Sequence, residues 1–190
     1  MSRRGGKANP TGEVIERDLA AAAIPLITDE WVQGVYTDPS KLTAVQRQAL
    51  SASDAFIDEL VAADTIVIGA PMYNFTVSST LKAWIDQVVR LGKTFVYGPN
   101  GRKGLLSGKR VVVITSRGGV YTRGAAAAQF DFQEPYLPQI LGFMGIADVT
   151  FIHADSQARP ELAELSRAAA LERIRQIAVQ TPAALQPIPS

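Results

Sequence analysis

Two short stretches of the sequence combine residue types that suit a flat ligand. The first, PMYNFTVSST, follows the apolar run TIVIGA, and the second, SRGGVYTRG, follows the apolar run RVVVIT. The first offers aromatic side chains beside a bare backbone, and adjacent glycines in the second let backbone N–H groups approach a ligand without interference from a Cβ atom. The residues concerned are Met72, Tyr73, Asn74 and Phe75 in the first stretch, and Ser116, Arg117, Gly118 and Gly119 in the second.

The positions of these stretches favour a shared site. Both follow β-branched runs typical of buried parallel strands, and open parallel sheets bind ligands outside the carboxyl ends of their strands. A helix N-terminus at Ser78–Ser79 adds partial positive charge on the same side. Each stretch alone is also compatible with a hydrophobic lid or an ordinary turn. Together they indicate a site for a polar heterocycle with an apolar body, and flavin answers that description.

The hydrophobic pattern predicts the elements that must position these loops. Continuous apolar runs predict strands at 65–69, 110–115 and 148–154, with a shorter strand within 12–19. Helices are predicted from Thr43 for about five turns, and over 78–91, 135–143 and 161–178. Alternating strands and helices indicate one α/β domain over residues 1–180 with a parallel sheet, followed by a disordered tail at 181–190.

Two of these elements carry more specific expectations. The strand at 65–69 is apolar throughout, so we expect it to be buried on both faces and to have ladder partners on both edges. The last helix carries four apolar residues that we expect on one side. They are Leu162, Leu165, Ala169 and Ile177.

The composition excludes several other kinds of chemistry. The sequence has no cysteine and a single histidine, His153, so thiol chemistry, disulfides and thiolate metal sites are excluded, and no metal is expected. A net charge of +1 gives no electrostatic reason to expect nucleic acid or a membrane surface as a partner. The lack of cysteine fits a cytoplasmic protein. His153, near a strand end and without a second ligand nearby, is predicted to be structural.

The motifs together closely resemble a known family. The loop APMYNF, the helix STLKAWID, and the segments GKTFVY, GLLSGK and VITSRGG lie in this order between Ile66 and Tyr121. This run is similar to the FMN-dependent NADH azoreductase and NADH:quinone oxidoreductase family, and weaker likeness extends over most of the chain. The resemblance implies a flavodoxin-like three-layer αβα fold and a homodimer with one FMN per subunit near the interface. It assigns FMN contacts to residues 72–75 and 116–119.

The resemblance also implies a reaction. NADH or NADPH reduces the flavin and leaves, and a quinone or azo compound then takes the two electrons in a ping-pong mechanism. The flavin carries the chemistry, so no side chain is expected to act as nucleophile or essential acid. Phe95, Tyr97 and Tyr121 are expected to line the substrate pocket, although Phe95 and Tyr97 are equally compatible with a hydrophobic plug beneath a loop.

The chain departs from the family at its beginning. Family members begin with a strand, a serine-rich phosphate-binding loop and a helix, whereas this sequence begins MSRRGGKANPTG before EVIERDL. We therefore expect the first strand and helix to be missing, which removes the main anchor of the FMN phosphate. The alternative function is a flavin-free scaffold, or a truncated inactive fragment that acts as a binding or assembly subunit.

Overall fold

The computed structural model describes residues 2–4, 12–21 and 23–180. Its centre is a parallel sheet of three strands in the order β3 (Thr65–Gly69), β6 (Arg110–Ser116) and β7 (Asp148–Ala154). The strands predicted at 65–69, 110–115 and 148–154 are therefore confirmed. All three strands run in the same direction, so their carboxyl ends lie at one edge of the sheet.

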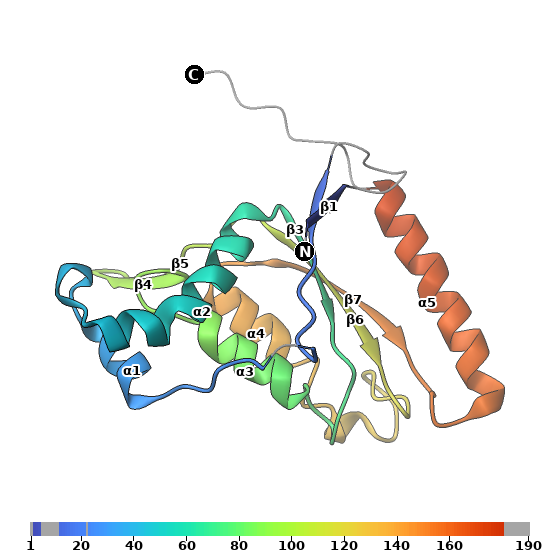
Figure 1. Ribbon diagram of the computed structural model, residues 1–190. Helices are drawn as coiled ribbons and strands as arrows, with labels where there is room; N and C mark the ends of the chain where they lie inside the picture. Colours follow the sequence, from blue (N-terminus) through green and yellow to red (C-terminus); the bar gives the residue numbers. More distant parts are fainter. Residues whose placement is uncertain (1, 5–11, 22, 181–190) are drawn as a thin grey trace.

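Helices cover both faces of this sheet (Figure 1). Helices α2 (Ala44–Ala62), α3 (Ser79–Val88) and α4 (Tyr136–Phe143) lie on one face, and α5 (Pro160–Gln180) lies on the other. The larger core joins the three helices to the inward side chains of the strands, including Val111 and Val113. A smaller core lies under α5. This is the three-layer αβα arrangement of the flavodoxin-like prediction.

The helix starts follow from local capping. The Oγ1 of Thr43 accepts from the backbone N–H of Gln46 at 3.2 Å, and the Gln46 side chain accepts from the N–H of Thr43 at 3.0 Å. This capping box lies at Thr43, where the sequence predicted the helix to begin, and it satisfies two otherwise unpaired donors. Ser78 caps α3 in the same manner by accepting from the N–H of Leu81. The first turn of α3 is thereby fixed directly behind the loop that follows β3.

Strand β3 differs from its prediction in both burial and pairing. Ile68 is buried, but Val67 on the opposite face is 63% exposed, so the strand is not buried on both faces. Within the described residues β3 forms ladder hydrogen bonds with β6 alone. The reason for the exposure lies in α5, which packs mainly against β7 and leaves this face of β3 without a helix above it.

The expected packing side of the last helix is also wrong. Leu165 is 70% exposed, and Leu162 and Ala169 are exposed as well. The buried side instead carries Ala163 and Ala170, with Ile174 and Ile177 partly buried. Small alanines let the helix approach the sheet closely, so residue size rather than hydrophobicity alone decided which side faces inward.

Several elements were not predicted. Helix α1 occupies a segment for which no element was predicted, and it begins after Thr28, whose side chain accepts from the N–H of Trp31. The strand within 12–19 is short and pairs antiparallel with a strand in the opening residues instead of joining the central sheet. A further hairpin lies between α3 and β6. These elements are β1 (Ser2–Arg4), β2 (Glu13–Ile15), α1 (Asp29–Tyr36), η1 (Pro39–Lys41), β4 (Phe95–Gly98), β5 (Gly101–Gly104) and η2 (Ala128–Phe130).

Two remaining expectations concern the ends of the chain and membranes. The tail predicted to be disordered at 181–190 lies outside the described residues. In the part of the chain that the structure describes, no helix combines the length and apolar character needed to cross a membrane.

Candidate functional site

The loop after β3 (residues 70–77, the β3 loop) closes on itself in a tight turn. The N–H of Tyr73 donates to the carbonyl of Thr76 at 3.0 Å, and the N–H of Thr76 donates to the carbonyl of Tyr73 at 3.1 Å. The two central residues, Asn74 and Phe75, have φ angles of 46° and 71°. Positive φ at both positions defines a type I′ turn, which asparagine tolerates but a bulky residue adopts only under strain. Such strain, held in place by surrounding contacts, is typical of functional loops.

The loop after β6 (residues 116–121, the glycine loop) lies beside the β3 loop. The N–H of Met72 donates to the carbonyl of Ser116 at 2.9 Å and joins the two loops directly. The carbonyls of Gly118 and Gly119 accept from the N–H groups of Ala158 and Ser156. Among the described residues, the N–H groups of Gly118 and Gly119 form no hydrogen bond. The structure therefore brings the two predicted segments together and leaves these two donors unpaired.

Exposed aromatic side chains surround the two loops. The ring of Phe75 lies 6.1 Å from that of Tyr121 and 5.3 Å from that of Phe130, between ring centroids. The N–H of Phe132 donates to the carbonyl of Phe75 at 3.0 Å, which fixes a third segment beside them. We call this cluster the aromatic rim. Its members are Tyr73, Phe75, Tyr121, Phe130 and Phe132, of which all but Tyr121 are exposed large hydrophobics.

Two members of the aromatic rim, Phe130 and Phe132, were missed by the sequence reading. They lie in QFDFQ, Phe130 as the last residue of η2 and Phe132 between η2 and α4, where the pattern gave neither a strand nor a helix. The available signal was two aromatic residues close together in a segment with no predicted strand or helix, since an exposed apolar patch often marks a binding site.

Arg117 has a different environment from its glycine neighbours. Its side chain is fully buried, and its guanidinium forms ion pairs with Asp155 and Asp131. Its backbone N–H donates to the carbonyl of Ala154 at 3.0 Å. The residue was predicted to contact a cofactor, but in the folded chain its guanidinium is engaged by these carboxylates and lies 5.9 Å from the ring centroid of Tyr121 in the aromatic rim.

His153 lies beneath the same loops as a structural residue. Its Nδ1 shares a hydrogen bond of 2.8 Å with the hydroxyl of Thr115, and its Nε2 lies 3.3 Å from a carboxylate oxygen of Glu134. Burial lowers the pKa of His153, and the nearby Arg117 lowers it further, against the opposing effect of Glu134, Asp155 and Asp131. The ring is therefore neutral at pH 7.

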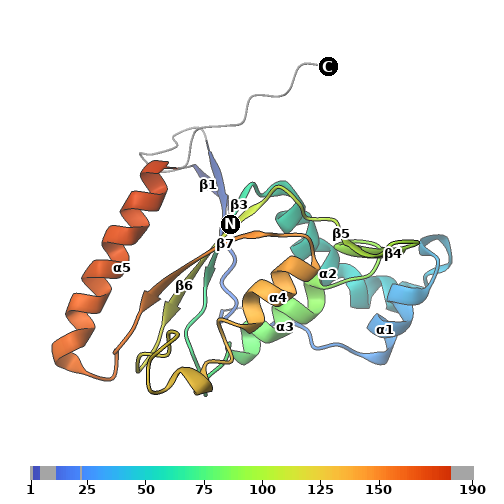
Figure 2. The ribbon, with the colours of Figure 1, turned by 180° about the vertical axis from the view of Figure 1, so that it is seen from behind.

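Phe95 and Tyr97 are not brought to the two loops within one chain. Both lie on the β4–β5 hairpin, where Phe95 is buried against Phe143 of α4 at 4.7 Å between ring centroids. Tyr97 packs edge-on against Phe95 and is 68% exposed. Figure 2 shows that the hairpin projects from the opposite side of the molecule to the loops at the carboxyl ends of the strands.

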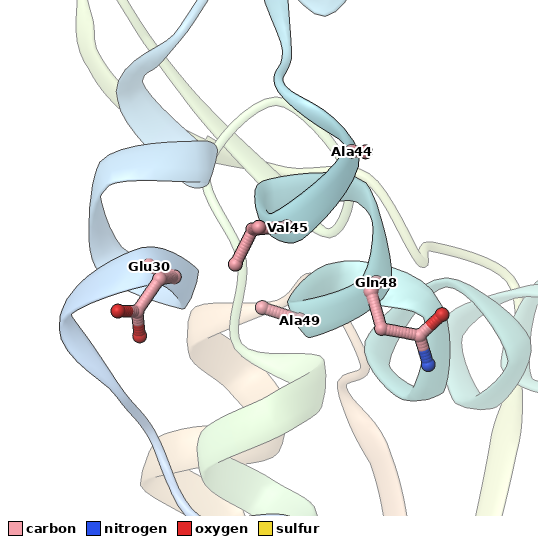
Figure 3. A pocket seen from close by; sticks show the side chains of 5 residues that line it. All are labelled: Glu30, Ala44, Val45, Gln48 and Ala49. Carbon is pink, nitrogen blue, oxygen red and sulfur yellow. The ribbon is translucent and has the colours of Figure 1, made fainter.

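A hollow lies between α1 and α2, far from the two loops. Glu30 of α1 faces Val45 and Ala49 of α2 across it, with Ala44 and Gln48 completing the lining (Figure 3). Its walls are mainly apolar, and its polar side chains do not converge on one point. Among the described residues there is also no group of three side chains able to hold a metal ion. The edge of the sheet with the β3 and glycine loops is therefore the better candidate site.

The fold and this edge define a class of protein. A model of the family described as having a flavodoxin-like fold matches residues 4–178, and the chain belongs to this family.

Relatives within the family have named activities. The chain is 48% identical over 170 residues to a protein of Nostoc sp. named FMN-dependent NADH:quinone oxidoreductase, covering 88% of this chain and 82% of the relative. Among solved structures, the azoreductase AzrA superposes with a TM-score of 0.85 at 30% identity, covering 92% of this chain and 86% of that one. An FMN-dependent NADH-azoreductase from Bacillus anthracis, solved in complex with FMN, gives a TM-score of 0.73 at 25% identity, with 85% and 80% covered.

The residues at the candidate site fit one end of FMN better than the other. The unpaired N–H groups of Gly118 and Gly119, beside the aromatic rim, suit the polar edge and apolar body of the isoalloxazine. A Cβ built on Gly118 would meet only the Cβ of Ala158, at 3.7 Å, so the space beside this glycine is open. The described residues near this edge include no comparable cradle for the phosphate, since the guanidinium of Arg117 is already engaged by carboxylates.

Proposed function

We propose that this chain is an FMN-dependent oxidoreductase that transfers two electrons from NADH or NADPH to quinones and azo compounds. The observation that carries the proposal is the joining of the β3 loop to the glycine loop, with unpaired amides beside an aromatic rim at the carboxyl edge of the sheet. The names of the relatives and of the solved structures support it. Residues 1–180 act in this proposal as one domain in the cytoplasm.

The protein contributes orientation and electrostatics. When bound, FMN supplies the two-electron chemistry. In the proposal, Met72, Tyr73, Asn74 and Phe75 hold one edge of the ring, while Ser116, Arg117, Gly118 and Gly119 hold the other. The N–H groups of Gly118 and Gly119 donate to ring atoms that gain electron density on reduction, which favours the reduced form. Tyr121 and the other rim residues exclude water and present a flat apolar surface to the acceptor.

The proposal includes a homodimer. Tyr97 is 68% exposed, and its hairpin lies away from the loops of its own chain. If Phe95 and Tyr97 line the substrate pocket, a second subunit must supply them. The ring of Phe95 packs against Phe143 on one side and edge-on against Tyr97 on another. In the proposal, the exposed ring of Tyr97 points toward the second subunit. One face of the flavin ring would then be open first to the nicotinamide and afterwards to the acceptor. A ping-pong mechanism needs this arrangement.

A titration with FMN tests the proposal directly. The purified chain is expected to quench FMN fluorescence with a saturable curve and to turn over NADH with a simple quinone. Initial rates at several quinone concentrations should give parallel double-reciprocal lines. A chain that stays colourless in excess FMN would contradict the proposal and favour the flavin-free scaffold.

A further inference from the structure

The side chain of Arg117 lies at the centre of a buried ion cluster. Its Nε donates to Oδ1 of Asp155 at 2.6 Å, and its Nη2 donates to Oδ2 of the same carboxylate at 3.1 Å. Its Nη1 donates to Oδ2 of Asp131 at 3.2 Å and lies 3.8 Å from Glu134. The side chain is completely buried, as arginine rarely is unless its donors are paired. The paired fork on Asp155 is the strongest geometry that an arginine and a carboxylate can adopt.

This cluster fastens three separate segments to one another. Arg117 opens the glycine loop, Asp131 belongs to the segment of the aromatic rim, and Asp155 follows β7. Each partner is in turn fixed by its own segment. The Oδ1 of Asp131 accepts from the N–H groups of Gln133 and Glu134 at 3.0 and 2.9 Å. A single guanidinium therefore sets the spacing of all three segments around the candidate site.

The backbone beside Arg117 continues this attachment into the glycines. The carbonyl of Arg117 accepts from the N–H of Gln157 at 3.0 Å, and that of Gly118 accepts from Ala158 at 3.2 Å. With their carbonyls held on the β7 side, the peptide units around the glycines cannot rotate freely. The N–H groups of Gly118 and Gly119 are consequently held in one orientation although they have no acceptor in the described chain.

The charge balance keeps the guanidinium from acting on a ligand. Three carboxylates, those of Asp131, Glu134 and Asp155, lie within 4 Å of Arg117. Moving the arginine toward FMN would leave the low-exposure carboxylates of Asp131 and Asp155 without a partner, which is very costly in a low-dielectric site. The guanidinium of Arg117 is therefore not free to act on a reduced ring, whereas the backbone N–H dipoles of Gly118 and Gly119 are.

We propose that Arg117 is a positioning residue that aligns the N–H groups of Gly118 and Gly119 for reduced FMN, through its ion pairs with Asp155 and Asp131. The inference rests on the proposed function, because it takes FMN as the ligand. It adds that the effect of Arg117 is selective for the reduced form. An aligned N–H dipole interacts more strongly with a ring that carries extra electron density than with a neutral one.

The test compares three single substitutions in the full chain. Arg117→Lys keeps the charge but loses the planar fork, and Asp155→Asn keeps the shape of the partner but removes its charge. Arg175→Lys is the matched control, because Arg175 pairs with Glu172 on the exposed side of α5. The measurements are the dissociation constant of FMN by fluorescence quenching, the midpoint potential of bound FMN, and the backbone order of Gly118 and Gly119 by 15N relaxation in the FMN-free chain.

Arg117→Lys is expected to weaken the binding of reduced FMN about tenfold more than the binding of oxidised FMN. This difference lowers the midpoint potential of bound FMN by about 30 mV for a two-electron couple. Asp155→Asn should shift the potential in the same direction by less, and the control should not shift it. In the FMN-free chain, both variants should lose backbone order at the two glycines. If Arg117→Lys does not fold, Asp155→Asn decides alone.

The inference is overturned if the folded variants keep the wild-type potential, or if their glycines stay as ordered as in the wild type. If the variants weaken the binding of oxidised and reduced FMN equally, the role of Arg117 is merely structural. If the wild-type chain binds no FMN, the proposed function has failed. The relaxation measurement on the glycines still tests the alignment by Arg117 separately.

Discussion

The β3 loop and the glycine loop are held in place by different means. The β3 loop is fixed from within, by a type I′ turn whose two hydrogen bonds close over only four residues. The glycine loop has no such turn and is fixed from a distance, by an ion cluster and by backbone bonds to the loop after β7. The first arrangement stores strain in one residue, while the second depends on several segments at once. Changes in the two loops should therefore have effects of different size and reach.

The largest effect is expected from removal of a buried partner in the ion cluster. Asp155→Ala leaves the guanidinium of Arg117 buried with Asp131 as its only close hydrogen-bonding partner. Breaking a buried pair in this way costs about 3–5 kcal/mol. Urea denaturation followed by circular dichroism measures the loss. The control, Glu164→Ala, removes an exposed carboxylate from α5 and should cost less than about 1 kcal/mol. Equal losses in the two variants would mean that the glycine loop does not depend on the cluster.

A bulky side chain at Gly118 should affect the ligand and spare the fold. A Cβ there meets only Ala158 at 3.7 Å, and no positive φ is recorded, so valine can be accommodated in the empty chain. With FMN bound, the same side chain would occupy the space of the ring. We expect Gly118→Val to weaken FMN binding roughly 100-fold, or about 2.7 kcal/mol. Fluorescence titration and thermal melting together check this, and a variant with normal FMN affinity would remove Gly118 from the site.

The turn of the β3 loop offers a contrasting test, because its strain is local. Phe75 has a φ of 71°, a conformation that costs a residue with a side chain about 1–2 kcal/mol. Phe75→Gly creates the Asn-Gly pair that type I′ turns favour. We expect the melting temperature to hold or rise, although the ring contacts with Tyr121 and Phe130 are lost.

The same variant should bind the acceptor less well, since it removes the centre of the aromatic rim. The expected kinetic signature is a higher KM for the quinone with an unchanged potential of bound FMN. Asn74→Gly is the matched control, because it eases the same turn and keeps the aromatic ring. A fall in stability with Phe75→Gly, and not with Asn74→Gly, would show that the ring contacts outweigh the strain.

The sequence predicted the layers and the two loops because their signals are local. Continuous β-branched runs, a capping box and adjacent glycines each act within a few residues, and the predicted strands and helices that follow from them agree with the structure. The exposure of Val67 and the inward side of α5 depend on which helix lies over which strand. Such pairings involve residues far apart in sequence, and no local pattern encodes them.

At the candidate site too, some features follow from local sequence and others depend on residues far apart in the chain. The glycines and aromatic residues could be found from their types, but the burial of Arg117 could not. Its partners Asp131 and Asp155 lie 14 and 38 residues further along the chain. An arginine in a glycine-rich loop is typical of an anion-binding contact, and only the three-dimensional arrangement shows that carboxylates occupy its donors. Tyr97 is a similar case in the proposed function, because its place in a pocket would depend on a second subunit.

The smallest expected effect is a pH dependence of stability, and it comes from His153, beside the ion cluster that holds the glycine loop. The pKa of His153 lies below its ordinary value of 6.5, chiefly because burial disfavours the charged ring, and also because Arg117 repels it. In the unfolded chain the ring takes up a proton near pH 6.5, whereas in the folded chain it does so only at lower pH. Between these two pKa values the unfolded state binds more protons. Stability is therefore fully present above pH 6.5 and is lost as the pH falls through the lowered pKa.

Replacing the histidine separates this contribution from that of the carboxylates. His153→Gln can still accept from Thr115 and donate to Glu134, but it does not titrate. We expect the wild type to lose stability relative to this variant as the pH falls from 7 through the lowered pKa of His153, because only the wild-type ring takes up a proton over this range. Urea denaturation at each pH gives the difference. The β3 loop contains no Asp, Glu or His among its residues 70–77, so its turn should be insensitive over this range. If instead the variant and the wild type lose stability in parallel, His153 does not contribute, and the glycine loop responds to acid only through its carboxylates.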